Sequence, residues 1–173
     1  MATSYVAGTL VESINSKFRN TLDLSTIDDS LVKSYSTSLT NGTGANKAQI
    51  QWADQRTLLT TAGETLDLRA LVGAAFGTAL FTKVKYLLIK PITATAGYRL
   101  EVGAADANQF CGSLGPLKDA TSLAIAGAGG GVKFESPVDG FTVDATHKDL
   151  KIYNPSGGSV TYDIIIIGEG SVA

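Results

Sequence analysis

The stretch Val160–Ile167 limits the fold of this chain more than any other, because it reads VTYDIIII and ends in four consecutive isoleucines. Isoleucine is β-branched and stiff at χ1, so it suits a strand better than a helix. The stretch has the length of a strand, since a membrane span needs roughly 20 apolar residues. Successive side chains of a strand point to opposite faces of its sheet. We therefore expect a central strand that is covered on one face by a second sheet and on the other by a loop, a helix or a neighbouring subunit.

Residues 80–167 contain further strand patterns separated by turn residues. Phe81–Lys90 is the longest and stops at Pro91, and Tyr98–Val102 alternates between apolar and polar side chains. Shorter patterns follow at Leu123–Ala126, Val132–Glu135, Phe141–Val143 and Leu150–Ile152. Strands at this spacing, with glycine and proline between them, are typical of sandwiches and barrels. The sequence predicts an all-β fold of this kind.

One stretch has the periodicity of a helix. Its apolar residues recur at a spacing that places them on one helical face, and they are Leu68, Leu71, Val72, Ala75 and Phe76. Asp67 can cap the start of such a helix, and Gly77 can end it. The pattern predicts one short helix or helical turn that closes an end of the sandwich.

Residues 1–44 differ in composition from residues 45–173. They are rich in Ser and Thr and contain few large apolar side chains. Strand-like pieces occur at Tyr5–Leu10, Ile14–Leu24 and Leu31–Leu39, and Asn41–Gly44 has the composition of a turn. We expect an extended N-terminal arm or edge strands over residues 1–44, followed by the sandwich domain over residues 45–173.

The charge content argues against nucleic acid as a partner. Charged residues make up 17% of the chain and the net charge is −2, whereas nucleic-acid binding requires a basic face. Lys83, Lys85 and Lys90 alternate along a predicted strand and are expected on a solvated face.

The apolar runs are of strand length, so we expect no membrane insertion. Residues 1–15 lack the basic and apolar regions of a secretory signal, so we expect synthesis and first folding in a cytoplasm.

Sets of residues that could perform chemistry are missing from the sequence. The only histidine, His147, has Asp144 and Asp149 near it, but the surrounding residues read as a polar loop. Because Cys111 is the only cysteine, an intrachain disulfide is impossible. No histidine lies at the spacing from Cys111 that a catalytic or metal-binding motif would have. The glycine-rich stretch 127–131 leads into a strand rather than a helix, so it does not match a phosphate loop. We predict no catalytic residue, no cofactor and no metal site.

Trp52 is the only tryptophan, and residues 45–59 fit a strand somewhat better than a helix. Such a residue usually anchors a core or an interface. The alternative is a platform on which a sugar ring stacks, and further aromatic residues could then take part, namely Tyr86, Tyr98, Tyr153 and Tyr162.

Several short runs resemble small structural proteins encoded in the virion gene clusters of tailed phages and prophages. The runs are Trp52-Ala-Asp-Gln-Arg56, Glu64-Thr-Leu-Asp-Leu68, Ala75-Phe-Gly77, Val84-Lys85, Ile89-Lys90, Leu100-Glu-Val-Gly103, Asn108-Gln-Phe110, Asp149-Leu-Lys-Ile152 and Tyr162-Asp-Ile-Ile-Ile-Ile-Gly168. The resemblance spans about residues 31–168. It implies an antiparallel, jelly-roll-like β-sandwich that forms part of a virion and has no catalytic residues.

The leading hypothesis from sequence is a phage capsid decoration or cement protein. It would form homo-oligomers, expected to be trimers, and would bind the major capsid protein or other virion proteins after assembly in the host cytoplasm. The interface candidates are Tyr5, Phe18, Tyr35 and Trp52. The alternative is a tail, fibre or spike component that recognises host-surface glycans, and an enzyme is a distant third.

Overall fold

The computed structural model describes residues 6–173 except 22, 24, 75–76, 111–116 and 118–122. The described residues contain strands and turns but no helix. In chain order the strands are β1 Gly8–Thr21, β2 Thr26–Asn41, β3 Lys47–Ala48, β4 Ile50–Leu58, β5 Gly63–Asp67, β6 Leu71–Ala74, β7 Gly77–Pro91, β8 Arg99–Gly103, β9 Leu123–Gly127, β10 Val132–Glu135, β11 Phe141–Thr142, β12 Asp149–Tyr153 and β13 Val160–Val172. The prediction of an all-β fold is confirmed.

The predicted short helix near Leu68 is wrong. Leu71–Ala74 forms β6, which pairs with β7, and Gly73 lies in the left-handed region with φ of 83°. The expected apolar face is also not buried as one surface, because Leu71 is 3% exposed whereas Val72 is 74% exposed. Hydrogen bonding to a neighbouring strand has therefore overridden the local helical spacing. Ala75 and Phe76 lie outside the described residues.

The strands of the body pair in a nested order, in which the first main strand of the body pairs with the last. β4 pairs with β13, β5 with β12, β7 with β10 and β8 with β9, and every pair is antiparallel. The pairs β13–β7 and β12–β8 then join these strands into two sheets, with the orders β10-β7-β13-β4 and β5-β12-β8-β9. The short strands β6 and β11 add to β7. The chain of the body thus resembles one long hairpin that has been folded over on itself.

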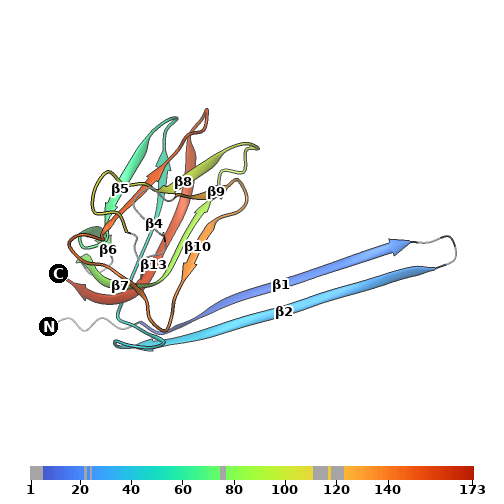
Figure 1. The fold of residues 1–173 in the computed structure, drawn as a ribbon, viewed down its shortest axis with the longest axis horizontal. Coiled ribbons are helices and arrows are strands. Elements are labelled where there is room, and N and C mark those ends of the chain that lie inside the picture. Colours follow the sequence, from blue (N-terminus) through green and yellow to red (C-terminus); the bar gives the residue numbers. More distant parts are fainter. Residues whose placement is uncertain (1–5, 22, 24, 75–76, 111–116, 118–122) are drawn as a thin grey trace.

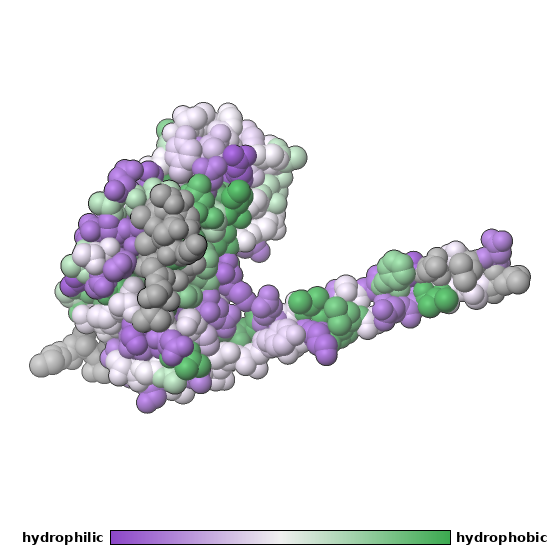
Figure 2. Space-filling model, in the orientation of Figure 1, coloured by the Kyte–Doolittle hydropathy of each residue, from purple (hydrophilic) through white to green (hydrophobic). Residues whose placement is uncertain are grey.

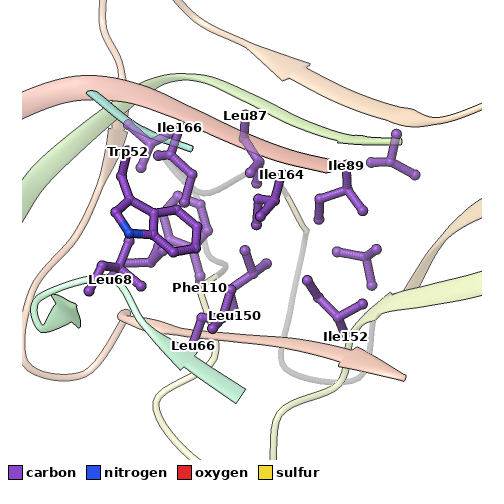
Figure 3. Packing of buried hydrophobic residues seen from close by; sticks show 14 of the residues in the cluster. Trp52, Leu66, Leu68, Leu87, Ile89, Phe110, Leu150, Ile152, Ile164 and Ile166 are labelled. Atoms are coloured by element: carbon purple, nitrogen blue, oxygen red, sulfur yellow. The ribbon is translucent and has the colours of Figure 1, made fainter. Parts of the chain in front are cut away.

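The core lies between these two sheets (Figure 3). Ile164 and Ile166 of β13 are fully buried, as are Leu150 and Ile152 of the facing sheet (Figure 3). β13 lies between β7 and β4, which confirms the prediction of a central strand. Its other face contains Ile165 and Ile167, which are only half-buried.

β1 and β2 form a long antiparallel hairpin that projects away from the body (Figure 1). Every residue of β1 has a partner in β2, from the Gly8–Leu39 pair at the base to the Thr21–Thr26 pair near the tip. The base joins the body where the end of β2 pairs in parallel with β3. We call this hairpin the arm. At about 3.3 Å per residue, β1 alone is about 45 Å long.

Candidate functional site

The arm is amphipathic, although it has no core of its own. Residues directly opposite each other in an antiparallel pair lie on the same face, so the register assigns each side chain of β1 and β2 to one of two faces. The large apolar residues of one face are Ile14, Phe18, Ile27, Leu31 and Tyr35. We call this set the apolar face of the arm. Its members are between 45% and 72% exposed, and hydrophobic atoms are visible along the arm in Figure 2.

The opposite face of the arm is polar. Asp28 accepts two hydrogen bonds from the Arg19 guanidinium, at 2.7 and 3.0 Å, and the Lys17 ammonium lies 2.8 Å from the same carboxylate. The hydrogen bonds from Arg19 and then Lys17 lower the pKa of Asp28 below its usual value. Val11 and Val32 are the only large apolar side chains described on this face. The arm therefore has one face suited to water and one suited to a protein surface.

A buried ion pair anchors the base of the arm to the body. The Lys85 ammonium lies 3.0 Å from a Glu169 carboxylate oxygen, and the side chains are 0% and 9% exposed. Both ends of this pair also bind the backbone of Gly44, in the turn that follows β2. The Gly44 amide donates to Glu169 at 2.9 Å, and its carbonyl accepts from Lys85 at 3.1 Å. Lys85 also donates to the Val138 carbonyl at 2.9 Å.

The burial of Lys85 corrects the expectation that it lies on a solvated face with Lys83 and Lys90. The register between β13 and β7 shifts between Ile167 and Gly168, so that Lys85 is an extra residue without a partner on β13. A β-bulge of this kind changes the direction of the side chains beyond it. Lys90, on the other side of the bulge, is exposed as predicted.

The glycine that follows the isoleucine run is a sequence signal for this bulge. A Cβ atom on Gly168 would lie 2.0 Å from the Lys83 carbonyl oxygen, so no other residue fits there. The sequence Gly168-Glu169-Gly170 places an acid between two glycines at the end of an apolar strand. A carboxylate in such a position indicates a buried partner of opposite charge, and Lys85 is that partner.

A second contact joins the arm to the outer face of the body. Glu12 lies on the same face of the arm as Ile14, and its carboxylate is 2.8 Å from the Lys133 ammonium of β10. A cleft of about 340 Å³ opens between the two elements, lined by Val11 and Glu12 on the arm and by Leu88, Lys90, Lys133 and the glycines 129–131 on the body. Beyond this point the arm leaves the body (Figure 1).

The aromatic residues named as sugar-stacking candidates are divided between the interior and the surface. Trp52 is 2% exposed and its indole donates a 3.0 Å hydrogen bond to the Val72 carbonyl. Tyr162 is fully buried and donates to Glu64, which also binds Arg56. Burial first, and this hydrogen bond second, raise the pKa of Tyr162 above its usual value. Neither ring can stack on a sugar from solvent.

Of the four interface candidates from sequence, Phe18 and Tyr35 lie together on the apolar face of the arm, 72% and 61% exposed. Trp52 is a residue of the core, as described above. Tyr5 lies outside the described residues, as does Cys111. Sequence reasoning did not single out Ile14, Ile27 and Leu31 of the same face, although the spacing of four residues from Ile27 to Leu31 to Tyr35 is a signal in the sequence.

The loop that contains His147 is a hydrogen-bonded turn. One Asp144 oxygen accepts from the backbone amides of Thr146 and His147, at 2.7 and 2.9 Å, and the His147 Nδ1 lies 3.0 Å from it. The amide of Thr146 makes the largest contribution to lowering the pKa of Asp144. Asp149 lies in β12 and contacts Lys148 instead. Within the described ranges no group of three potential metal ligands comes together.

Comparison of the sequence with protein-family models and with curated proteins finds no match. The described part of the chain also contains no helix that is long and apolar enough to cross a membrane.

Proposed function

We propose that this protein is a structural subunit of a bacteriophage virion, and specifically a capsid decoration or cement protein that attaches to the major capsid protein and stabilises the shell. The observation that carries the proposal is the apolar face of the arm. A two-stranded hairpin is marginally stable in water by itself, and this one presents five large apolar side chains to solvent. Such a face fits a role in which another protein covers it.

The topology of the body supports the same proposal. The first main strand, β4, pairs with the last, β13, and the inner strands pair in the same nested way. We interpret this as a jelly roll, in which two sheets are formed by one folded-over hairpin. Jelly rolls are common in viral capsid proteins, but also in lectins and cupins. Because a fold does not determine a function, this support is secondary to that of the arm.

The energetics favour an assembly in which several arm contacts act together. Burying one Leu, Ile or Phe side chain contributes about 1.5–3 kcal/mol, and the five side chains of the apolar face are already about half-buried. One arm therefore gains on the order of 5 kcal/mol, against a cost of association of about 4–15 kcal/mol. A single contact is marginal, whereas a homo-oligomer, which we expect to be a trimer, combines several contacts in one particle.

Recognition of host glycans by a tail or fibre component is less well supported. Two of its five named aromatic residues, Trp52 and Tyr162, are buried in the core. Tyr86, Tyr98 and Tyr153 are half-buried and lie on different strands or loops. A glycan array that gave specific binding would revive this alternative.

Uptake onto capsids tests the proposal with a matched pair of variants. Leu31 and Val32 are neighbours in β2, 48% and 68% exposed, on the apolar and the polar face respectively. We expect the wild-type protein and Val32→Asp to co-sediment with capsids assembled without this protein, and Leu31→Asp to remain in the supernatant. If the wild-type protein fails to bind capsids or any other virion part, the proposed function is wrong.

A further inference from the structure

We propose that the apolar face of the arm binds the outer face of the β10-β7-β13-β4 sheet of a second copy of this chain, so that the copies close into a ring. This inference rests on the proposed function and deepens it, because it assigns the apolar face of the arm to contacts between copies, so that the assembled ring is the unit that attaches to the capsid. Four features of the molecule support this contact: the composition of the receiving surface, the divergence of the arm from its own body, the dimensions of the arm and the charges on both surfaces.

The receiving surface is the side of the sheet that faces away from the core. Its centre is formed by residues that are neighbours across three adjacent strands, namely Ala53 of β4, Ile165 and Ile167 of β13, and Leu88 and Tyr86 of β7. We call this set the receiving face. Ala53 is exposed, and the other four are half-buried. Polar residues surround this apolar centre, as at a protein interface with a polar rim.

Within one chain the arm begins to contact this sheet but does not cover it. The Glu12–Lys133 ion pair joins the base of the apolar face of the arm to the edge of the sheet. Beyond Glu12 the arm diverges, and hydrophobic atoms of the body remain visible on the side that faces it (Figure 2). The two surfaces are therefore compatible where they meet. In its described residues, the outer part of the arm, from Ile14 to the tip, does not contact its own sheet (Figure 1), which leaves it free to contact the sheet of a neighbour.

The dimensions of the arm fit a neighbouring body. A strip about 45 Å long and about 10 Å wide can cross a domain of this size, whose radius of gyration is about 14 Å. Its flat area of about 450 Å² is smaller than the roughly 800 Å² that each partner contributes to a stable interface. A subunit that gives one arm and receives another buries this area twice, once on its arm and once on its receiving face. In a closed assembly every copy does both, and no arm is left uncovered.

The charges on the two surfaces do not oppose this contact. The apolar face of the arm is bordered by Asp29 and Lys33, and the receiving face by Lys90 and Asp163. None of these four takes part in an ion pair among the described residues. Lys133 and Glu135 of β10 also border the receiving face, and Lys133 is ion-paired with both Glu135 and Glu12 of the arm. Apart from these paired groups, each surface offers one cation and one anion.

Complementation between two variants of the full-length chain tests the inference. Leu31→Asp disables the arm, and Ala53→Arg blocks the receiving face without removing a buried group, because Ala53 is already exposed. Each variant alone should self-associate about 30-fold more weakly than the wild type or worse, which is the effect of losing an interface hot spot. An equimolar mixture should associate more weakly than the wild type but more strongly than either variant alone, as a one-to-one heterodimer, because one intact arm can still occupy one intact receiving face.

Two controls make the outcome decisive. Ile125→Arg adds the same charge to an exposed residue on the outer face of the other sheet and should assemble like the wild type. Ile165→Lys should reproduce Ala53→Arg, and the fluorescence of buried Trp52 reports whether each variant is folded.

The inference is overturned if Ala53→Arg and Ile165→Lys both assemble normally, because another surface then receives the arm. It is also overturned if the mixture associates no more strongly than the separate variants, because an intact arm would then fail to bind an intact receiving face. Capsid uptake is measured separately, so a ring that fails to bind capsids would reject the proposed function and leave this inference intact.

Discussion

Single residues decide how the arm is attached to the body. Lys85 and Glu169 form one buried ion pair. Glu169 also accepts from the Gly44 amide, and Lys85 donates to the Gly44 carbonyl. Alternation along Phe81–Lys90 predicted the strand but placed Lys85 on the wrong side, because alternation assumes a regular ladder and this one contains a bulge. At this bulge only glycine fits at position 168, because a Cβ there would meet the Lys83 carbonyl oxygen, and that contact is with a strand that is distant in sequence.

Removing one partner of this ion pair should be costly. Lys85→Met leaves a buried carboxylate without its cation, so we expect the free energy of unfolding to fall by about 3–5 kcal/mol. The double variant Lys85→Met with Glu169→Leu should be less destabilised than Lys85→Met, because no unpaired charge remains. Urea unfolding followed by Trp52 fluorescence measures both. Lys90→Met, at an exposed lysine of the same strand, is the matched control and should change little.

A cost below about 1 kcal/mol for Lys85→Met, the value typical of exposed ion pairs, would contradict the view that this pair anchors the turn after β2.

At the scale of elements, sequence patterns predicted the strands of the body better than the arm. β7, β8, β9, β10, β12 and β13 all overlap the strand patterns read from the sequence. The arm was expected as three short pieces, because Ser and Thr hide the continuous alternation that its register reveals. The helix near Leu68 was predicted from spacing alone, and pairing with β7 overrides that spacing. Both errors come from long-range pairing, which a local pattern does not contain.

The arm should be dispensable for folding of the body. Deleting residues 1–38 removes the projecting part of the hairpin but keeps Leu39, which is 3% exposed and belongs to the body's interior. We expect the remaining chain to unfold in one cooperative transition, with a free energy of unfolding within about 1 kcal/mol of the value for the dissociated full-length protein. Urea unfolding provides the comparison. Loss of the cooperative transition would mean that the arm is part of the folding unit.

At the scale of the whole molecule, the body has a buried core whereas the described part of the arm has none. The nested strand pairing buries a continuous core among the described residues of the body. The arm presents Phe18, Leu31 and Tyr35 to solvent. The sequence predicted two of the exposed arm aromatics as interface candidates, but it could not show that they share a face, because that depends on the β1–β2 register.

Sedimentation velocity of the full-length protein beside the chain that lacks residues 1–38 tests the central claim most directly. If other copies cover the apolar face of the arm, the full-length protein sediments as a closed oligomer, expected to be a trimer. The truncated chain then sediments as a folded monomer. A full-length protein that remains monomeric at concentrations of about 100 μM, well above the micromolar Kd expected of a specific assembly, would contradict the claim.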